Sequence, residues 1–380
     1  MVVREGLARI PAGCAVAGIV DRRRQAMKAD GIVTMISLMH DRSNGLGGGF
    51  AVYGCYPDMS DYYAFHLFYE SSSAQTETEQ FMSIYFKVEQ KEPIPVRKNG
   101  LQKHAPRIWR YFVKPKVSEI NEQDLSEEEY IIKTVMSINR DIPGAFVASS
   151  GKNMGAFKAV GYPEDVADFY RLEEYQGYLW LAHGRFPTNT PGWWGGAHPF
   201  TLLDWSVVHN GEISSYGANR RYLEMFGYHC GLQTDTEAIT YLLDLLVRKH
   251  RLPLLTALNI FAAPFWEEIG RMDQERQRLW KMLRSVYGSA LLNGPFSIIV
   301  GCSHGLIAMN DRIKLRPLVA AVNTEKVYVA SEEAAIRAVC RQPDKLWTPA
   351  GGEPVLAWVE HQTSKHGSSS LCDGLVREVS

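Results

Sequence analysis

The sequence predicts a layered α+β domain. Short apolar segments typical of strands come in consecutive runs beside helical segments, which favours packed layers over the strict strand–helix alternation of a doubly wound parallel sheet. The chain has 380 residues, enough for one large domain or two ordinary ones. Hydrophobic residues make up 46% of it and charged residues 22%, so a sizeable core can be buried.

Charge and cysteine content exclude several classes of protein. Lys and Arg (41) balance Asp and Glu (42), so no basic field is available for nucleic acid or an acidic membrane. No apolar run approaches the roughly 20 residues of a membrane span. The six cysteines are scattered without CxxC spacing, which indicates reduced thiols rather than disulfides or a zinc site. We therefore expect a cytoplasmic protein whose chain holds no metal.

The first part of the chain indicates strand, helix, turn and strand. Residues 16–20 form an apolar run, residues 24–40 carry apolar side chains at helical spacing, and the glycines of 45–49 lead into a second apolar run. These glycines follow a helix, precede a strand and lack the lysine of a phosphate loop. They predict a turn and not a nucleotide site.

Residues 56–176 carry weaker signals. "YYAFHLFYE" and "RIWRYFVK" are typical of strands, and "KEPIPVRKNG" of a loop. "SEEEYIIKTVMSIN" predicts a helix opened by a capping box of Ser126 and Glu129.

From Tyr178 onward the pattern is clearer. A strand "YLWLAHG", a Pro/Gly/Trp-rich loop to Pro199 and a strand "WSVVHNG" precede a helix from about Ser215. A second helix starts with a capping box of Thr234 and Glu237. Strands follow at "FSIIVGC", "LIAMND", "LVAAVN" and "VYVASE", and then a helix at "EEAAIRAVC".

Three segments place polar residues at the ends of these elements. Arg185 directly follows an apolar strand, where its guanidinium suits a carboxylate ligand or an internal salt bridge. Asn210 and Gly211 end the next strand, either as a simple turn or as two donors of an oxyanion hole. Asp235 lies in the first turn of a helix, where it compensates the helix dipole or receives a substrate ammonium.

Together these groups fit one ligand, an amino acid that undergoes acyl transfer at its side chain. Cys14 stands at the edge of the first strand, just after Pro-Ala-Gly. Removal of residues 1–13 would give it a free α-amine of pKa ~7.7–8.0, which can accept the proton of a thiol of pKa ~8.5. Cys14 is therefore predicted to be an N-terminal nucleophile.

Two further groups have ordinary interpretations. The histidines at 183, 198, 209 and 229 match no metal-ligand pattern, and we expect hydrogen-bonded structural side chains. Trp193 and Trp194, in the loop after Arg185, either anchor a partner protein or pack on their own domain.

The motifs resemble those of the class II (N-terminal nucleophile) glutamine amidotransferases, and in particular the amidotransferase domain of glutamate synthase. "HGRFPTNT", "HNGEISS" and "TDTE" occur in that order and at similar spacing in the family, and a block similar to "NDRIKLRPL…VYVASEEAAI" follows. The resemblance covers Cys14 to about Gly54 and Tyr178 to about Val339. It implies a four-layer αββα sandwich that hydrolyses glutamine to glutamate and ammonia through a cysteinyl thioester.

The resemblance also implies roles for individual residues. Cys14 would be the nucleophile, Arg185 would bind the glutamine carboxylate, Asn210 and Gly211 would form the oxyanion hole, and Asp235 would bind the α-amine. Two positions depart from the family pattern: Ala15 replaces the usual glycine after the cysteine, and Asn44 stands where an aspartate is usual.

The expected organisation is a leader of residues 1–13 that is removed, an amidotransferase domain of 14–363 with a weakly matching insertion at 56–176, and a flexible tail of 364–380. The chain ends where glutamate synthase continues into its synthase part. The resemblance therefore implies a partner subunit, similar to glutamate synthase or N-methylglutamate synthase, that holds FMN and an iron–sulfur cluster. The alternatives are a catalytically silent glutamine-binding regulatory subunit and an N-terminal nucleophile hydrolase of another amide.

Overall fold

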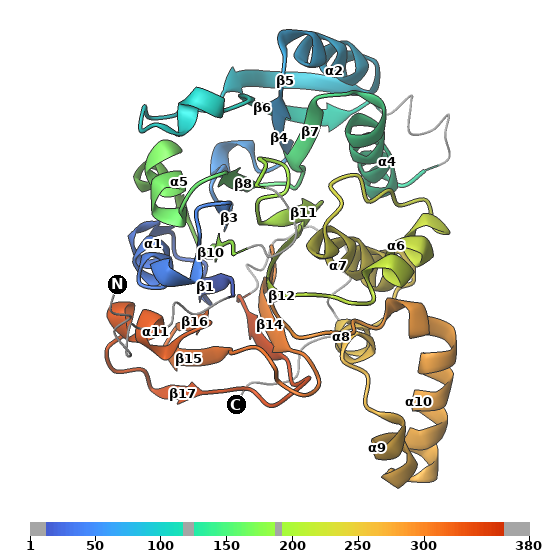
Figure 1. Cartoon of the computed structure of the whole chain (residues 1–380). Coiled ribbons are helices and arrows are strands. Elements are labelled where there is room, and N and C mark those ends of the chain that lie inside the picture. The colour runs from blue at the N-terminus through green and yellow to red at the C-terminus, as the bar shows by residue number, and fades with distance from the viewer. Residues whose placement is uncertain (1–12, 117–124, 187–191, 361–380) are drawn as a thin grey trace, which may run out of the picture.

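Two antiparallel sheets packed face to face form the centre of the molecule (Figure 1). The computed structural model describes residues 13–116, 125–186 and 192–360. The first sheet has the order β17-β15-β16-β1-β10-β3-β8, and the second β11-β12-β13-β14-β18. The strands of the first are β1 (Ala15–Asp21), β3 (Gly48–Tyr53), β8 (Met154–Ala159), β10 (Leu179–Gly184), β15 (Val319–Asn323), β16 (Lys326–Ala330) and β17 (Lys345–Trp347). The strands of the second are β11 (Phe200–Leu202), β12 (Trp205–Gly211), β13 (Phe296–Cys302), β14 (Gly305–Asn310) and β18 (Val355–Trp358).

Helices cover the outer face of each sheet. On the first sheet α1 packs on β1 and β10, α5 on β3, and α11 on β16. On the second sheet α7 packs on β11 and β12, next to α6. The bounds are α1 (Asp30–Ser37), α5 (Pro163–Phe169), α6 (Tyr216–Glu224), α7 (Asp235–Leu243), α8 (Leu254–Phe261) and α11 (Glu333–Val339). The predicted four-layer αββα sandwich is confirmed.

An apolar layer fills the space between the two sheets. Val16 and Val20 of β1 meet Val208 of β12 and Ile299 of β13 in one buried cluster. Since side chains alternate along a strand, the even-numbered positions of β1 face the second sheet. Cys14, two residues before Val16, therefore lies at the end of this layer.

The segment expected as an insertion divides into two parts. A separate sheet of order β5-β6-β4-β7 carries α2 and α4, whereas β8 and α5 belong to the sandwich. The bounds are β4 (Tyr63–Tyr69), α2 (Ser72–Tyr85), β5 (Phe86–Pro93), β6 (Arg107–Pro115), α4 (Glu127–Asp141) and β7 (Ala145–Ser149). This four-stranded unit lies beside the sandwich (Figure 1).

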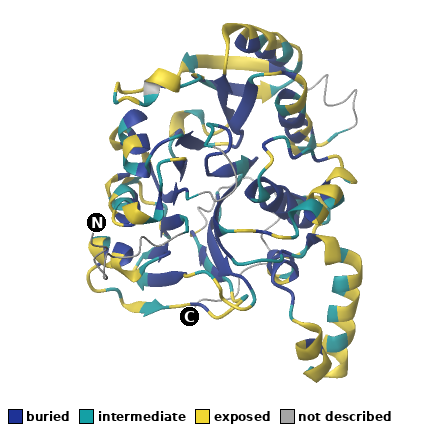
Figure 2. Ribbon diagram, in the orientation of Figure 1, coloured by how far each residue is buried: buried dark blue, intermediate teal, exposed yellow. Residues whose placement is uncertain are grey.

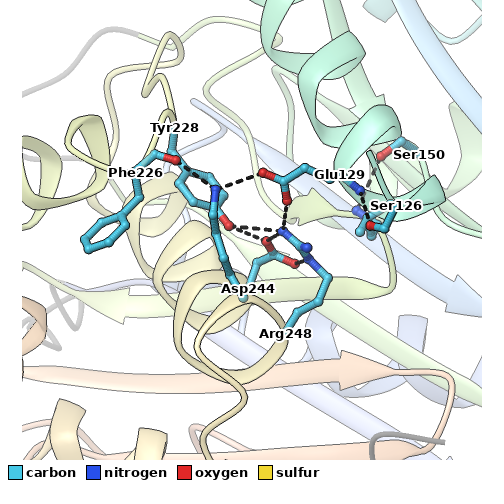
Figure 3. Close-up of polar contacts among 9 residues, drawn as sticks. Ser126, Glu129, Ser150, Phe226, Tyr228, Asp244 and Arg248 are labelled. Atoms are coloured by element: carbon cyan, nitrogen blue, oxygen red, sulfur yellow. Dashed lines mark hydrogen bonds and ion pairs between the residues drawn. The ribbon is translucent and has the colours of Figure 1, made fainter. Parts of the chain in front are cut away.

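A partly buried charge network joins this unit to the sandwich (Figure 3). Helix α7 continues as a π-helical segment, Asp244–Lys249. There the guanidinium of Arg248 donates to Asp244 and to Glu129 of α4, each at 2.8 Å. Tyr228 donates its hydroxyl to Asp244 at 2.5 Å, and Lys249 donates to Glu129 at 2.8 Å.

Some elements differ from the sequence predictions. The helix expected over 24–40 begins only at Asp30, because β2 (Met27–Lys28) pairs with β9 (Gln176–Gly177). Helix α2 was not predicted, because its buried side includes Gln75 and Thr78 and so lacks an apolar stripe. Strand β5 also runs into the segment expected as a loop.

The two predicted capping boxes are half formed. Ser126 and Thr234 accept hydrogen bonds from the backbone N–H groups of Glu129 and Glu237. The carboxylate of Glu129 instead joins the charge network, and that of Glu237 accepts from the backbone of Leu232.

A helical hairpin, α9 (Trp266–Arg271) and α10 (Gln274–Tyr287), projects from the sandwich, and most of its surface is exposed (Figure 2). In residues 13–116, 125–186 and 192–360, no helix is long and apolar enough to span a membrane. The expected tail at 364–380 and residues 1–12 of the leader lie outside the described residues.

Candidate active site

A pocket of about 300 Å³ opens where β1 begins. Cys14, Arg185, Gly211 and Asp235 all line it. They come from the start of β1, the residue after β10, the end of β12 and the start of α7. The structure thus brings together four of the five predicted site residues, which are up to 221 positions apart in the chain.

The Cys14 thiol is half-buried beside a backbone donor. The N–H of Phe186 donates to Sγ at 3.3 Å. Burial raises the pKa of Cys14, and the Phe186 hydrogen bond and the charge of Arg185 only partly oppose this. The thiol is therefore protonated in the resting site, and a nearby base is needed to make it nucleophilic.

The glycine-rich turn holds Arg185. The side chain of Arg185 is 5% exposed, and its backbone N–H donates to the carbonyl of Gly47 at 2.8 Å. A Cβ atom on Gly47 would lie 3.0 Å from Cδ of Arg185, closer than side chains normally pack. Asn44, at the variant position, accepts from the N–H of Leu46 at 3.2 Å and donates its own N–H to the Arg185 carbonyl. The glycines therefore let the loop close over the arginine.

Asp235 is held as a carboxylate by its neighbours. Its Oδ2 accepts from the N–H of Ile213 at 3.0 Å, and its Oδ1 lies 3.5 Å from Nδ1 of His209 and 3.3 Å from the hydroxyl of Thr236. Burial alone would raise the pKa of Asp235. The charge and hydrogen bond of His209 and the backbone donors outweigh burial, so the pKa lies below the usual 3.8. An ionised Asp235 suits a substrate ammonium.

Three histidines extend inward from Asp235. His183 and His198 stack with ring centres 3.9 Å apart, and His198 and His209 both contact the Thr236 hydroxyl, at 2.7 and 3.2 Å. Burial lowers the pKa of His183 to about 3, so this ring is neutral. The second ring nitrogen of each histidine has no partner in the described part of the chain; these atoms are Nδ1 of His183, Nδ1 of His198 and Nε2 of His209. The expectation of hydrogen-bonded histidines therefore holds for one nitrogen of each of these rings.

The predicted oxyanion-hole residues differ in their placement. A Cβ atom on Gly211 would lie 1.9 Å from the carbonyl oxygen of Pro295, so only glycine fits at this position of the pocket wall. Asn210 is completely buried and is not among the pocket-lining residues. Its Oδ1 lies 3.5 Å from where a Cβ on Gly13 would be, so its side chain lies next to the chain that leads into Cys14.

Sequence reasoning missed the residues that support the site. Phe186, Thr236 and His209 lie one residue from Arg185, Asp235 and Asn210, so adjacency to a predicted site residue was the available signal. Trp193 is half-buried against Phe146, with ring centres 5.5 Å apart, and Trp194 packs on Phe68 at 6.0 Å and on Phe169 at 5.8 Å. Both tryptophans pack on their own domain.

Comparison with known proteins identifies the family of the chain. The family model "Glutamine amidotransferases class-II" matches residues 70–343. The chain belongs to the class II glutamine amidotransferases. As a member of that family it is an amidotransferase of glutamine. The match includes most of the segment expected as an insertion, while Cys14 precedes it.

Individual relatives of this amidotransferase are diverse. An uncharacterised protein of Archaeoglobus fulgidus is 49% identical over 346 residues, which is 90% of this chain and 91% of the relative. A glutamine–fructose-6-phosphate aminotransferase of Vibrio vulnificus is 27% identical over 60% of this chain and 35% of its own length. Among solved structures, a glutamine phosphoribosylpyrophosphate amidotransferase of B. subtilis aligns with a TM-score of 0.44 and 15% identity, over 90% of this chain and 47% of its own.

Proposed function

We propose that the chain is an active glutaminase subunit that hydrolyses glutamine at Cys14 and passes the ammonia to a partner. The observation that supports this most strongly is the convergence of Cys14, Arg185, Gly211 and Asp235 on one pocket. A buried guanidinium and an ionised carboxylate in one pocket match the two charges of a free amino acid.

The proposed reaction needs one nucleophile and one base. The freed α-amine of Cys14 takes the proton of Sγ, and the thiolate attacks the side-chain amide carbon of glutamine. Asn210 and Gly211 donate to the resulting oxyanion. The protonated amine gives its proton to the departing nitrogen, which leaves as ammonia and a glutamyl thioester remains. A water molecule, deprotonated by the same amine, then releases glutamate and restores the thiol.

The position of Gly13 supports removal of the leader. In the full chain Gly13 lies against Oδ1 of Asn210, and the nitrogen of Cys14 belongs to a peptide bond. A peptide nitrogen cannot act as a base. Hydrolysis of the Gly13–Cys14 bond supplies the amine and removes the residue that lies against the Asn210 amide.

The thiol and its amine can be tested together. Intact-mass and N-terminal analysis of active enzyme should find Cys14 as the first residue. Cys14→Ala should abolish glutamine hydrolysis and labelling by a glutamine-like electrophile, whereas Cys55→Ala and Cys302→Ala should leave both unchanged. Full activity with residues 1–13 attached would refute the terminal-amine mechanism, and a mature protein that binds glutamine without hydrolysing it would support the silent regulatory alternative.

The partner is proposed from the resemblance of the motifs to the glutamate synthase amidotransferase. We infer a synthase subunit of that type that holds the FMN and iron–sulfur groups and consumes the ammonia. Glutaminase turnover should be measured for the protein alone and co-expressed with a candidate synthase subunit. A complex on gel filtration with raised turnover is expected, while equal turnover without a complex would remove the partner from the proposal.

A further inference from the structure

A row of buried polar side chains crosses the second sheet beside Cys14. Asn210 of β12 is directly opposite Ser297 of β13, which is directly opposite Asn310 of β14. Residues opposite one another in an antiparallel sheet point to the same face. Each lies two residues from Val208, Ile299 or Ala308 of the inter-sheet cluster, so the row faces the first sheet, where β1 begins.

The row is buried, and most of its polar atoms lack partners in the described residues. All three residues are 0% exposed. Both side-chain atoms of Asn210, Oγ of Ser297 and Oδ1 of Asn310 have no hydrogen-bond partner within residues 13–116, 125–186 and 192–360. Buried polar groups are nearly always paired, so a row with four unpaired atoms is suited to form hydrogen bonds with a group that arises only in the mature protein.

The row lies under the chain that leads into Cys14. At one end, Oδ1 of Asn210 lies 3.5 Å from the Cβ position of Gly13. At the other end, the Asn310 amide donates to the carbonyl of Arg316 at 2.5 Å, and Nη1 of Arg316 lies 3.3 Å from the same Gly13 position. Ser297 lies between Asn210 and Asn310 in the row, on the face of the sheet that is turned toward β1.

We propose that Ser297 and Asn310, together with Asn210, form the binding site of the α-amino group that is freed on Cys14, and that Ser297 and Asn310 are positioning residues for this base. The inference rests on the proposed function. The row offers acceptor oxygens to the N–H groups of an amine, which a peptide nitrogen with one N–H cannot use fully. With its N–H groups held by the row, the lone pair of the amine is left for the proton of Sγ.

Charges of both signs surround this junction. Arg316 and Arg42 approach Gly13, and Arg185 and Asp235 act on Cys14 from the pocket side. Arg42 is paired with Glu332, and Glu212 lines the pocket and acts on Arg185, so these charges nearly balance. The acceptors of the row favour the protonated amine, and their loss should shift the acid limb of the kcat–pH profile to lower pH.

Ser297→Ala and Asn310→Leu test the proposal, and Ser206→Ala is the matched control. Ser206 is a serine of the same sheet and is equally buried, but its Oγ accepts from the Tyr53 hydroxyl at 2.7 Å, and it lies at the opposite end of β12 from Asn210. Ser297→Ala should lower kcat about tenfold and shift the acid limb, with KM for glutamine and the unfolding midpoint unchanged. Ser206→Ala should do the reverse, lowering the midpoint without moving the pH profile.

The outcomes separate this inference from the proposed function. Wild-type enzyme that starts at Cys14 and hydrolyses glutamine, with both row variants folded and equal to it in kcat and pH profile, would overturn the inference alone. An effect of Ser206→Ala on the pH profile as large as that of Ser297→Ala would also overturn it. Wild-type enzyme that is active with residues 1–13 attached would overturn the terminal amine and the row with it.

Discussion

The polar row beside Cys14 is fully buried, and the charge network around Arg248 is partly buried. The two regions differ in how their polar atoms are paired. In the network, Asp244 accepts from Arg248 and Tyr228, and Glu129 accepts from Arg248 and Lys249 (Figure 3). In the row, four polar atoms have no partner in the described residues.

The difference indicates what each region does. A buried group with all its partners contributes to a single folded arrangement, and here it fixes α4 of the four-stranded unit to the sandwich. A buried group without a partner costs stability, and a protein retains it where another molecule or a later chemical step supplies the partner. We therefore expect substitutions in the network to affect folding and substitutions in the row to affect catalysis.

The largest effect should come from breaking the network. Arg248→Met leaves the Asp244 carboxylate, whose side chain is 0% exposed, without its cation. Removing one partner of a buried ion pair typically costs about 3–5 kcal/mol, so the urea unfolding midpoint should fall sharply. The folded enzyme should keep its kcat and KM.

An exposed ion pair is the control for this prediction. The side chains of Arg276 and Asp273 are 75% and 58% exposed, and Arg276→Met should cost less than about 1 kcal/mol. Equal losses in the two variants would show that the network does not hold the two units together.

Substitution in the row should have the opposite effect, with a large loss of activity and little loss of stability. Asn210→Ala removes a donor to charge that exists only near the transition state, so kcat should fall about 10²–10³-fold. The unfolding midpoint should hardly change, because neither polar atom of the side chain has a partner to lose. Steady-state kinetics and urea titration on the same preparation measure both. A large loss of stability with nearly normal kcat would reverse the assignment.

The contrast also shows what the sequence could predict. Most of the site could be predicted from the residues at the ends of two strands, Arg185 and Asn210-Gly211, because these local motifs occur at similar spacing in the family. The row of Ser297 and Asn310 could not be predicted, since it exists only through the register of three strands.

Other features arise only from tertiary packing. Lys158 is 1% exposed, its ammonium donates to the carbonyls of Gly195 at 3.0 Å and Pro199 at 3.3 Å, and burial lowers its pKa to about 7. In the sequence it is one lysine in an ordinary strand. The helix expected from residue 24 likewise began later because a distant segment, 176–177, pairs with residues 27–28.

A smaller effect should follow from loss of the groups that bind the unreacting end of glutamine. Arg185→Ala and Asp235→Ala each remove a charge-assisted contact worth about 1.5–3 kcal/mol, so KM should rise about 10–100-fold. Since these contacts are the same in substrate and transition state, kcat should change much less. An unchanged KM with a collapsed kcat would contradict the proposed binding roles and would indicate that these residues, like those of the row, act in catalysis.

The smallest effect should be a change in the pH dependence of KM when His209 is replaced. Because the pKa of Asp235 lies below 3.8, the carboxylate is ionised throughout the neutral range, and KM for glutamine should stay constant until the pH approaches that pKa. His209→Asn removes the charge that contributes to this low pKa, so burial should raise the pKa of Asp235 and KM should begin to rise at a higher pH. At neutral pH the variant should bind glutamine almost normally, with a rise of a few fold only at the acid end. Parallel KM–pH profiles for the variant and the wild type would show that the backbone donors of Ile213 and Thr236 keep Asp235 ionised without the histidine.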